Sequence, residues 1–301
     1  MDATLIQKLQ NSPALPSLPS IAIDVLRLAE DPSASMGKIA ESVQKDVAFT
    51  AQLLKTANSA FYGQRREVNS VEFALQLIGL KAAIPLIISI SMNSLRQSCD
   101  STIDLQMYWR RSVLTSCLST KLAEFSDTAR KEEALLAGLV QDIGVLAGTV
   151  LFPEEYGNLP ASTWENHHEL LPFEKELYND NHISIGNWLL ESWDFPPIVI
   201  DAVKHSHKTP DQLDRDLAWC VSGSSLMADC ILRGLESGNL WNEVKSCLRL
   251  EWLNVPEEKI TALTIEMMEL VLEAESIFDI EILPKDILNV IEQKKAELVA
   301  S

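Results

Sequence analysis

Residues 46–63 read DVAFTAQLLKTANSAFYG, and the first half of this stretch predicts an α-helix. Its apolar side chains fall on one helical face, at Phe49, Leu53, Leu54 and Ala57. Asp46 precedes the run and can accept hydrogen bonds from the amides of the first turn. Asn58 and Ser59 follow the run, where a side-chain amide or hydroxyl can close the helix and turn the chain. We therefore predict structural roles for these three polar residues; a binding role for Asn58 is the alternative.

The same apolar period recurs along almost the whole chain, whereas the alternating pattern of a β-strand is hard to find. Caps and breakers such as Asp31-Pro32, Gly79 and Pro196-Pro197 separate the periodic segments. We therefore predict an all-α fold, a multi-helix bundle. The expected helices span residues 2–11, 19–30, 35–44, 47–57, 70–78, 80–97, 103–126, 130–149, 161–179, 182–193, 196–206, 214–236, 240–248, 256–278 and 284–299.

The polar segment from Ser98 to Thr102 is the predicted seam between two helical bundles. Residues 1–100 form the first bundle, residues 101–210 form the second, and residues 211–301 add C-terminal helices that complete it. Because apolar periodicity runs through both bundles and the seam is short, we expect them to pack firmly as one cooperative body.

Acidic residues dominate the charge, because 43 Asp and Glu oppose 25 Lys and Arg and give a formal net charge of −18. Such a field repels phosphate backbones and anionic lipid surfaces, so nucleic-acid binding is disfavoured. The most apolar run, Ala82–Met92, contains Pro85 and is about half as long as a membrane-spanning helix. The first residues, MDATLIQKLQ, lack the basic and apolar regions of a signal peptide. We therefore expect a cytoplasmic chain without membrane insertion.

The five cysteines are scattered, without a CxxC pair: Cys99, Cys117, Cys220, Cys230 and Cys247. This pattern predicts reduced thiols rather than a disulfide framework or a zinc knuckle. The sequence also lacks the motifs GxxxxGKS/T, GxGxxG, GxSxG and HExxH, which mark common nucleotide-binding and hydrolytic sites.

Three segments in the first hundred residues resemble, in their order and spacing, the HDOD domain. They are LPSLP at residues 15–19, the segment 46–63 quoted above, and SVEFALQLIGL at residues 70–80. The resemblance covers roughly residues 12–210. It implies an all-helical output or scaffold module of bacterial signal transduction, often found with response-regulator or cyclic-dinucleotide domains. No such domain fits within these residues, so we expect a module that meets its partners in trans.

The second half resembles a degenerate member of the HD superfamily, whose hydrolases hold divalent metals with a histidine, a His-Asp pair and a later aspartate. Arg111 in WRRS stands where the first histidine is expected, and Gln141-Asp142 in GLVQDIG stands where the His-Asp pair is expected. Further positions similar to the polar sites of the superfamily are His182, His205, His207 and Asp229.

These substitutions argue against metal catalysis. A guanidinium stays protonated and only donates hydrogen bonds, so Arg111 is not a ligand, and the amide of Gln141 is a weak one. We therefore predict no catalytic residue, no metal and no cofactor. Arg111 is expected to fill the vacated pocket and to pair with Asp142.

One metal site stays open as an alternative, built from His182, Asp142, Asp229 and one histidine of the KHSH segment. On a helix His205 and His207 point roughly 200° apart, so they do not easily share one ion.

The resemblance and the lost ligands together predict a non-catalytic output or scaffold protein that binds other signalling proteins, with a homo-oligomer left open. The candidate binding residues are Trp188, Trp193 and Phe195, because aromatic residues are favoured at interface centres, although core packing explains them equally well. Two alternatives are a metal-dependent phosphohydrolase acting on a nucleotide or cyclic dinucleotide, and a catalytically inactive sensor that binds such a nucleotide through Arg111.

Overall fold

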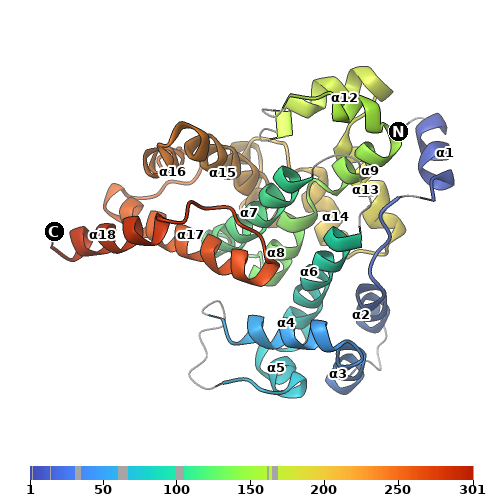
Figure 1. The fold of residues 1–301 in the computed structure, drawn as a ribbon, viewed down its shortest axis with the longest axis horizontal. Coiled ribbons are helices and arrows are strands. Elements are labelled where there is room, and N and C mark those ends of the chain that lie inside the picture. Colours follow the sequence, from blue (N-terminus) through green and yellow to red (C-terminus); the bar gives the residue numbers. More distant parts are fainter. Residues whose placement is uncertain are drawn as a thin grey trace.

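The computed structural model describes residues 1, 3–13, 15–30, 35–59, 67–98, 105–160, 163–164 and 169–300. Over these ranges the chain forms helices joined by turns and contains no strand, which confirms the all-α class (Figure 1).

The helices are given in three groups, by the segments 1–100, 101–210 and 211–301. The first segment contains α1 (Ala3–Asn11), α2 (Ser20–Glu30), α3 (Met36–Gln44), α4 (Val47–Ala57), α5 (Val71–Ile78) and α6 (Leu80–Ser98). The second contains α7 (Gln106–Leu122), α8 (Lys131–Val140), α9 (Ile143–Leu151), α10 (Pro153–Gly157), α12 (Leu170–Tyr178), α13 (His182–Ser192) and α14 (Pro197–Lys204). The last contains α15 (Leu217–Ser237), α16 (Leu240–Leu248), α17 (Glu257–Phe278) and α18 (Ile287–Ala300).

The helix α4 shows how its sequence sets its ends. Oδ1 of Asp46 accepts a hydrogen bond from the amide of Phe49 at 2.9 Å and so caps the first turn. At the other end Nδ2 of Asn58 donates to the carbonyls of Leu54 and Val68, both at 2.8 Å, and Oδ1 accepts from the amide of Val68 at 2.7 Å. One amide side chain therefore closes the helix and fastens the returning chain. At Ser59 the backbone amide donates to the carbonyl of Thr56.

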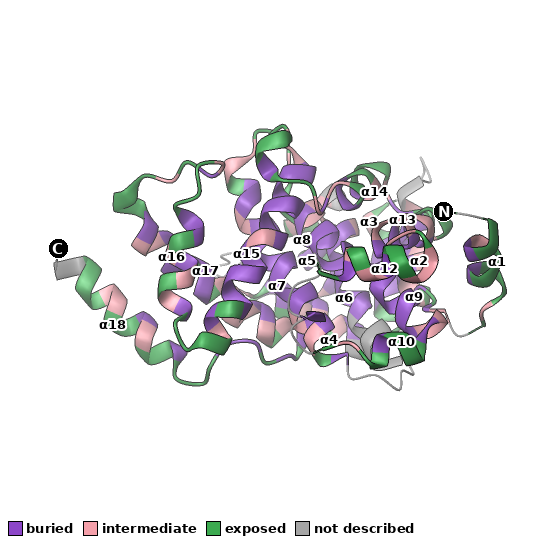
Figure 2. Ribbon diagram, turned by 90° about the horizontal axis from the view of Figure 1, so that it is seen from above, coloured by how far each residue is buried: buried purple, intermediate pink, exposed green. Residues whose placement is uncertain are grey.

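The helix α6 links two apolar cores. A smaller core is formed by side chains of α2 to α6 and also takes in Leu135 of α8. The main core extends from α1 to α18 and includes Ile88 and Met92 of α6. Burial is concentrated where α6, α7, α8 and α15 meet, whereas α1 and α18 lie at opposite ends (Figure 2). The predicted seam at 98–102 lies almost wholly outside the described residues, which omit 99–104.

The helical stretch from Lys131 to Leu151 is long and apolar enough to cross a membrane by length and composition, and 89% of its most apolar window is buried inside the protein. Such burial is typical of a core helix. Ala82–Met92, the most apolar run expected from the sequence, is a shorter apolar helix.

The expected single helix over 130–149 was also wrong, because the chain turns at Gln141 and Asp142 between α8 and α9. The amide of Val145 donates to the carbonyl of Asp142, a three-residue spacing tighter than that of an α-helix.

Candidate functional site

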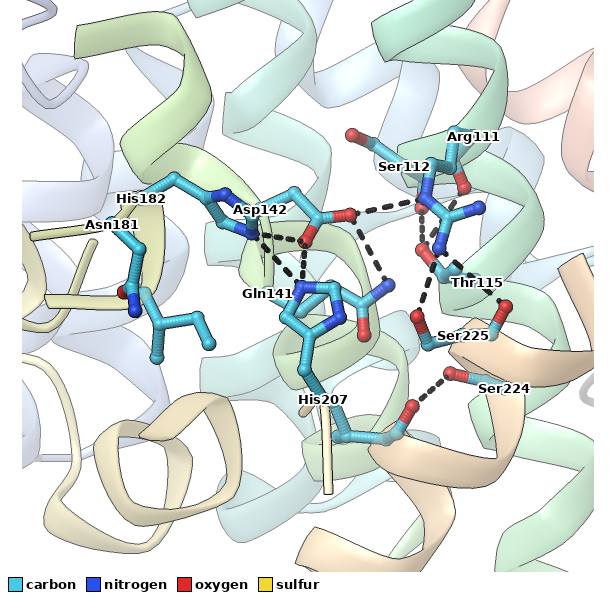
Figure 3. Close-up of polar contacts among 12 residues, drawn as sticks. Arg111, Ser112, Thr115, Gln141, Asp142, Asn181, His182, His207, Ser224 and Ser225 are labelled. Atoms are coloured by element: carbon cyan, nitrogen blue, oxygen red, sulfur yellow. Dashed lines mark hydrogen bonds and ion pairs between the residues drawn. The ribbon is translucent and has the colours of Figure 1, made fainter. Parts of the chain in front are cut away.

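Seven polar side chains meet in the interior where α7, the α8–α9 turn, α12, α13, α15 and the turn after α14 converge. We call them the buried ionic cluster: Arg111, Gln141, Asp142, Glu174, His182, His207 and Asp229. None of the charged side chains is more than 6% exposed. Figure 3 shows Asp142 between Arg111 on one side and the two histidines on the other.

Close helix packing places Arg111 against Asp142. A Cβ atom on Gly138 would lie 2.6 Å from the carbonyl oxygen of Thr115, so α7 and α8 approach closely at these two residues. The hydroxyl of Thr115 donates to the carbonyl of Gly138 at 2.8 Å. One helical turn before Thr115 lies Arg111, and four residues after Gly138 lies Asp142, so their side chains face each other.

All three nitrogen atoms of the Arg111 guanidinium have protein partners. Nε donates to Oδ2 of Asp142 at 3.3 Å, Nη1 pairs with Oδ1 of Asp229, and Nη2 donates to the hydroxyl of Ser225 at 2.8 Å. Burial opposes the charged form, but the two carboxylates outweigh it and raise the pKa of Arg111 further. The predicted pair with Asp142 is confirmed. Asp229 pairs with the same guanidinium and is not one of the possible metal ligands.

A second set of contacts holds His182 in one orientation. Oε2 of Glu174 lies 2.7 Å from Nδ1 of the ring and accepts the backbone amide of His182 at 2.8 Å. Nε2 then points toward Nε2 of His207 at 2.9 Å and Oδ1 of Asp142 at 3.6 Å. Burial disfavours a charged ring, but Glu174 and Asp142 outweigh burial and raise the pKa of His182 above its ordinary value.

Glu174 was not found by sequence analysis. Its Oε1 accepts a hydrogen bond from the hydroxyl of Tyr156 at 2.6 Å, and that hydroxyl also lies 3.2 Å from the hydroxyl of Tyr178. Burial raises the pKa of Glu174, but His182 and Tyr156 outweigh it and hold the pKa below its ordinary value. A signal was present, because Glu174 lies four residues after Leu170 and four before Tyr178, on the buried face of α12.

The structure separates the two histidines of KHSH. Nε2 of His207 lies 3.3 Å from Oδ1 of Asp142, inside the cluster. His205 lies outside it, partly exposed, with Nδ1 at 3.6 Å from Asp201. Gln141 stays at the edge of the cluster, where its Nε2 donates to Oδ2 of Asp142 at 3.5 Å.

Three donor atoms of the cluster suit one metal ion. Oδ1 of Asp142, Nε2 of His182 and Nε2 of His207 are separated by 2.9, 3.3 and 3.6 Å. Ligand atoms about 2.1 Å from a tetrahedral zinc ion lie about 3.4 Å apart, so the spacing fits. The carboxylate of Glu174 on Nδ1 is the outer contact that orients a metal-binding histidine.

The charge balance also favours a cation, because the cluster holds three carboxylates, of Asp142, Glu174 and Asp229, and only one guanidinium, of Arg111. Two further positive charges, from a divalent ion or from two protonated histidines, neutralise the cluster. The residues therefore fit one ion, whereas Arg111 takes the place beside it.

The aromatic candidates lie away from this cluster. Trp188 and Trp193 are partly exposed and line a cavity of about 520 Å³ together with Leu15 and Pro16, which belong to the α1–α2 connection. Phe195 is buried in the main core, so its ring contributes to packing and not to a binding surface.

Comparison with known proteins identifies the family. The model of the HDOD domain matches residues 15–209, more than half of the chain. The chain therefore belongs to the HDOD domain family, as its sequence motifs predicted.

Individual proteins are similar to this chain in sequence or in fold. A protein of Treponema pallidum (strain Nichols) is 24% identical over 264 residues, which are 87% of this chain and half of the relative's length. The crystal structure of a "Putative phosphohydrolase" from Shewanella amazonensis SB2B is 21% identical, with a TM-score of 0.68 over 92% of this chain and 98% of that one. A "Putative signal transduction protein" from Marinobacter aquaeolei VT8 is 18% identical, with a TM-score of 0.59 over 93% of this chain and 61% of that one.

Proposed function

We propose that this chain is a non-catalytic module of bacterial signal transduction that acts by binding other signalling proteins in trans, in the cytoplasm. The observation that carries the proposal is the state of Arg111, which is fully buried with every guanidinium nitrogen held by protein atoms. The resemblance of WRRS to the HD superfamily implies that this arginine replaces a metal-binding histidine of HD hydrolases.

The burial of the donors argues against turnover. A hydrolytic metal needs an open coordination position for water and a path for the substrate. The side chains of Asp142 and His182 are fully buried, and that of His207 is 3% exposed. A phosphate that approached Arg111 would have to displace the carboxylates of Asp142 and Asp229. The same closure therefore argues against a nucleotide sensor that uses Arg111.

A direct assay tests the absence of chemistry. The purified chain is incubated with phosphomonoesters, nucleotides and cyclic dinucleotides while Mg²⁺, Mn²⁺ or Zn²⁺ is supplied. We expect no hydrolysis above that of the buffer. Turnover by the wild type that disappears in Asp142→Asn would overturn the proposal.

The surface that we assign to a partner is the cavity lined by Trp188 and Trp193. Tryptophan contributes strongly to binding when it is covered at an interface centre, and both rings are partly exposed here. Affinity capture from the native cell is compared for the wild type, Trp188→Ala and the control Leu250→Ala, an exposed apolar residue of the α16–α17 connection. We expect a signalling protein that Trp188→Ala loses and Leu250→Ala retains; equal capture by all three contradicts the assignment.

The three metal-binding atoms of Asp142, His182 and His207 support a second candidate role. In this role the buried ionic cluster binds one divalent ion that stabilises the structure. The metal-free protein is titrated with Zn²⁺ by calorimetry. A bound ion predicts one equivalent in the wild type, loss of binding in His207→Ala and retention in His205→Ala, which changes the neighbouring histidine outside the cluster. Absence of binding by the wild type would reject this role and leave the first proposal standing.

A further inference from the structure

Cys230 and Cys247, which are seventeen residues apart in sequence, lie opposite each other across the contact of α15 with α16. The two helices approach most closely at Gly234, where an added Cβ atom would lie 2.7 Å from Cα of Leu240 and 3.2 Å from Cβ of Glu243. The helices run antiparallel after the turn at Gly238. One turn from Gly234 toward the start of α15 lies Cys230, and one turn from Glu243 toward the end of α16 lies Cys247.

The two thiols interact, and they differ in character. Both thiols are buried, and Nη2 of the exposed Arg233 lies 3.4 Å from the Cys230 sulfur. The hydrogen bond from Cys247 and the charge of Arg233 outweigh burial and hold the pKa of Cys230 below its ordinary value. The pKa of Cys247 is raised, first by its bond to Cys230 and then by burial. Cys230 is therefore the more acidic of the two thiols.

Two other cysteines show the contrasting state. Burial raises the pKa of both Cys117 and Cys220 to about 12. The thiol of Cys117 donates to the backbone carbonyl of Leu114 at 3.1 Å. Both are expected to be inert and serve as internal controls.

We propose that Cys230 and Cys247 form an oxidisable dithiol site, which a hydroperoxide converts into a disulfide between α15 and α16. The Cys230 thiolate attacks one peroxide oxygen, the O–O bond breaks, and the leaving oxygen takes up a proton. Cys230 is then a sulfenic acid. The sulfur of Cys247 attacks the Cys230 sulfur as its proton leaves, the S–O bond breaks, and water departs. The peroxide is reduced by two electrons, and the two thiols are oxidised to one disulfide.

The position of the pair gives the modification a reach beyond α16. Cys230 directly follows Asp229, which pairs with Arg111 inside the buried ionic cluster. A disulfide would therefore fasten α16 to the turn of α15 that enters the cluster. This inference stands on the cysteines and Arg233 and does not depend on the proposed function.

The test uses the full chain in a Cys99→Ser background, which removes the cysteine outside the described residues. Folded protein is treated with hydrogen peroxide, unfolded without reductant and blocked with an alkylating agent, and its intact mass is measured. We expect two alkyl groups fewer than on the untreated control, and a cross-linked peptide pair containing Cys230 and Cys247. Cys247→Ser should stop at a sulfenic acid that dimedone traps on residue 230, and Cys230→Ser should form neither product. Cys117→Ser should behave like its parent.

The peptide map of the parent protein shows which cysteines are oxidised, so it tests the proposal even where a substitution impairs folding. Both thiols still reduced in folded protein, while Cys117 or Cys220 is oxidised, would overturn the proposal. Equal rates at all four cysteines would overturn it as well, because selectivity is its central claim. Arg233→Met should slow the reaction several-fold, and an unchanged rate would remove Arg233 from the account.

Discussion

Nε of Arg111 lies 3.3 Å from Oδ2 of Asp142, across the contact between α7 and the α8–α9 turn. Both side chains are fully buried, so the charge that remains when either partner is removed has no water to solvate it. Removal of either partner alone is therefore expected to destabilise the protein strongly, and this cost can be measured.

Arg111→Met is expected to lower the free energy of unfolding by about 3–5 kcal/mol, because Asp142 and Asp229 then stay buried without a cation. Asp142→Leu should also destabilise strongly. The double variant should lose less than the sum of the two single losses, because the same contact is removed twice. Urea denaturation of the four proteins gives the coupling.

An exposed ion pair supplies the control for this experiment. Arg249 and Glu257 form a bidentate contact at the surface, with side chains 46% and 66% exposed. Arg249→Met should leave the midpoint of denaturation almost unchanged, because water solvates the remaining charge. Small and additive effects of Arg111→Met and Asp142→Leu would contradict the assigned role.

Stability of the metal-free protein should depend on pH through His182. Its pKa is raised in the folded state, where burial is outweighed by Glu174 and Asp142, while His207 and Arg111 also face the ring. The folded state thus binds this proton more tightly than the unfolded chain. The contribution is full below the unfolded value of about 6.5 and is lost as the pH rises through the folded pKa.

Glu174 gives the opposite limb of the pH profile. Its pKa is lowered in the folded state, so its contribution to stability is present above the ordinary value and is lost as the pH falls through the folded pKa.

Denaturation between about pH 4 and 9 should show His182→Gln losing the alkaline fall in stability that the wild type and His205→Gln retain. Identical profiles for His182→Gln and the wild type would contradict the raised pKa of His182. Bound Zn²⁺ should remove the fall, because a ligand histidine is neutral.

Gly144 allows α9 to pack closely against α13 at His182. A Cβ atom there would lie 2.0 Å from the carbonyl oxygen of His182 and 2.6 Å from the amide nitrogen of Gly186. Gly144→Ala should therefore destabilise the protein by about 3 kcal/mol or more, because backbone must move. Gly37→Ala, in an exposed turn of α3 with nothing nearer than 3.7 Å, should be neutral or stabilising. Equal thermal midpoints for both variants would show that the contact can yield.

Asn58 should be more costly to replace than its exposure suggests. Asn58→Ala removes its three hydrogen bonds to Leu54 and Val68 and should lower the free energy of unfolding by about 1–2 kcal/mol. Asn58→Asp keeps the acceptor for the Val68 amide and should lose less. Hydrogen exchange at the Val68 amide reports the contact directly. Unchanged protection there in Asn58→Ala would show that the contact is dispensable.

The fold was predictable because its signals are local. The apolar period of α4 and its flanking Asp46 and Asn58 follow from side chains within a few residues of one another. The turn between α8 and α9 was missed because apolar residues continue on both sides of Gln141 and Asp142. At this turn Asp142 pairs with Arg111 of α7, and a periodic pattern does not record contacts between distant helices.

The site was predictable only in part for the same reason. Resemblance pointed to Arg111 and Asp142, and the structure brings them together. It could not choose between His205 and His207, since that depends on how the chain leaves α14. Glu174 could not be distinguished from neighbouring acidic residues, because its role depends on contacts with Tyr156 and His182. These residues lie 18 and 8 residues away along the chain.

The pairing of Arg111 with the carboxylates of Asp142 and Asp229 also affects how such a protein can evolve. A change of residue 111 alone to histidine would leave Asp229 buried without its guanidinium partner. Glutamine at 141 would still need a second change. The first step from this arginine back to a histidine is therefore expected to pass through a less stable protein, so that folding itself opposes the return.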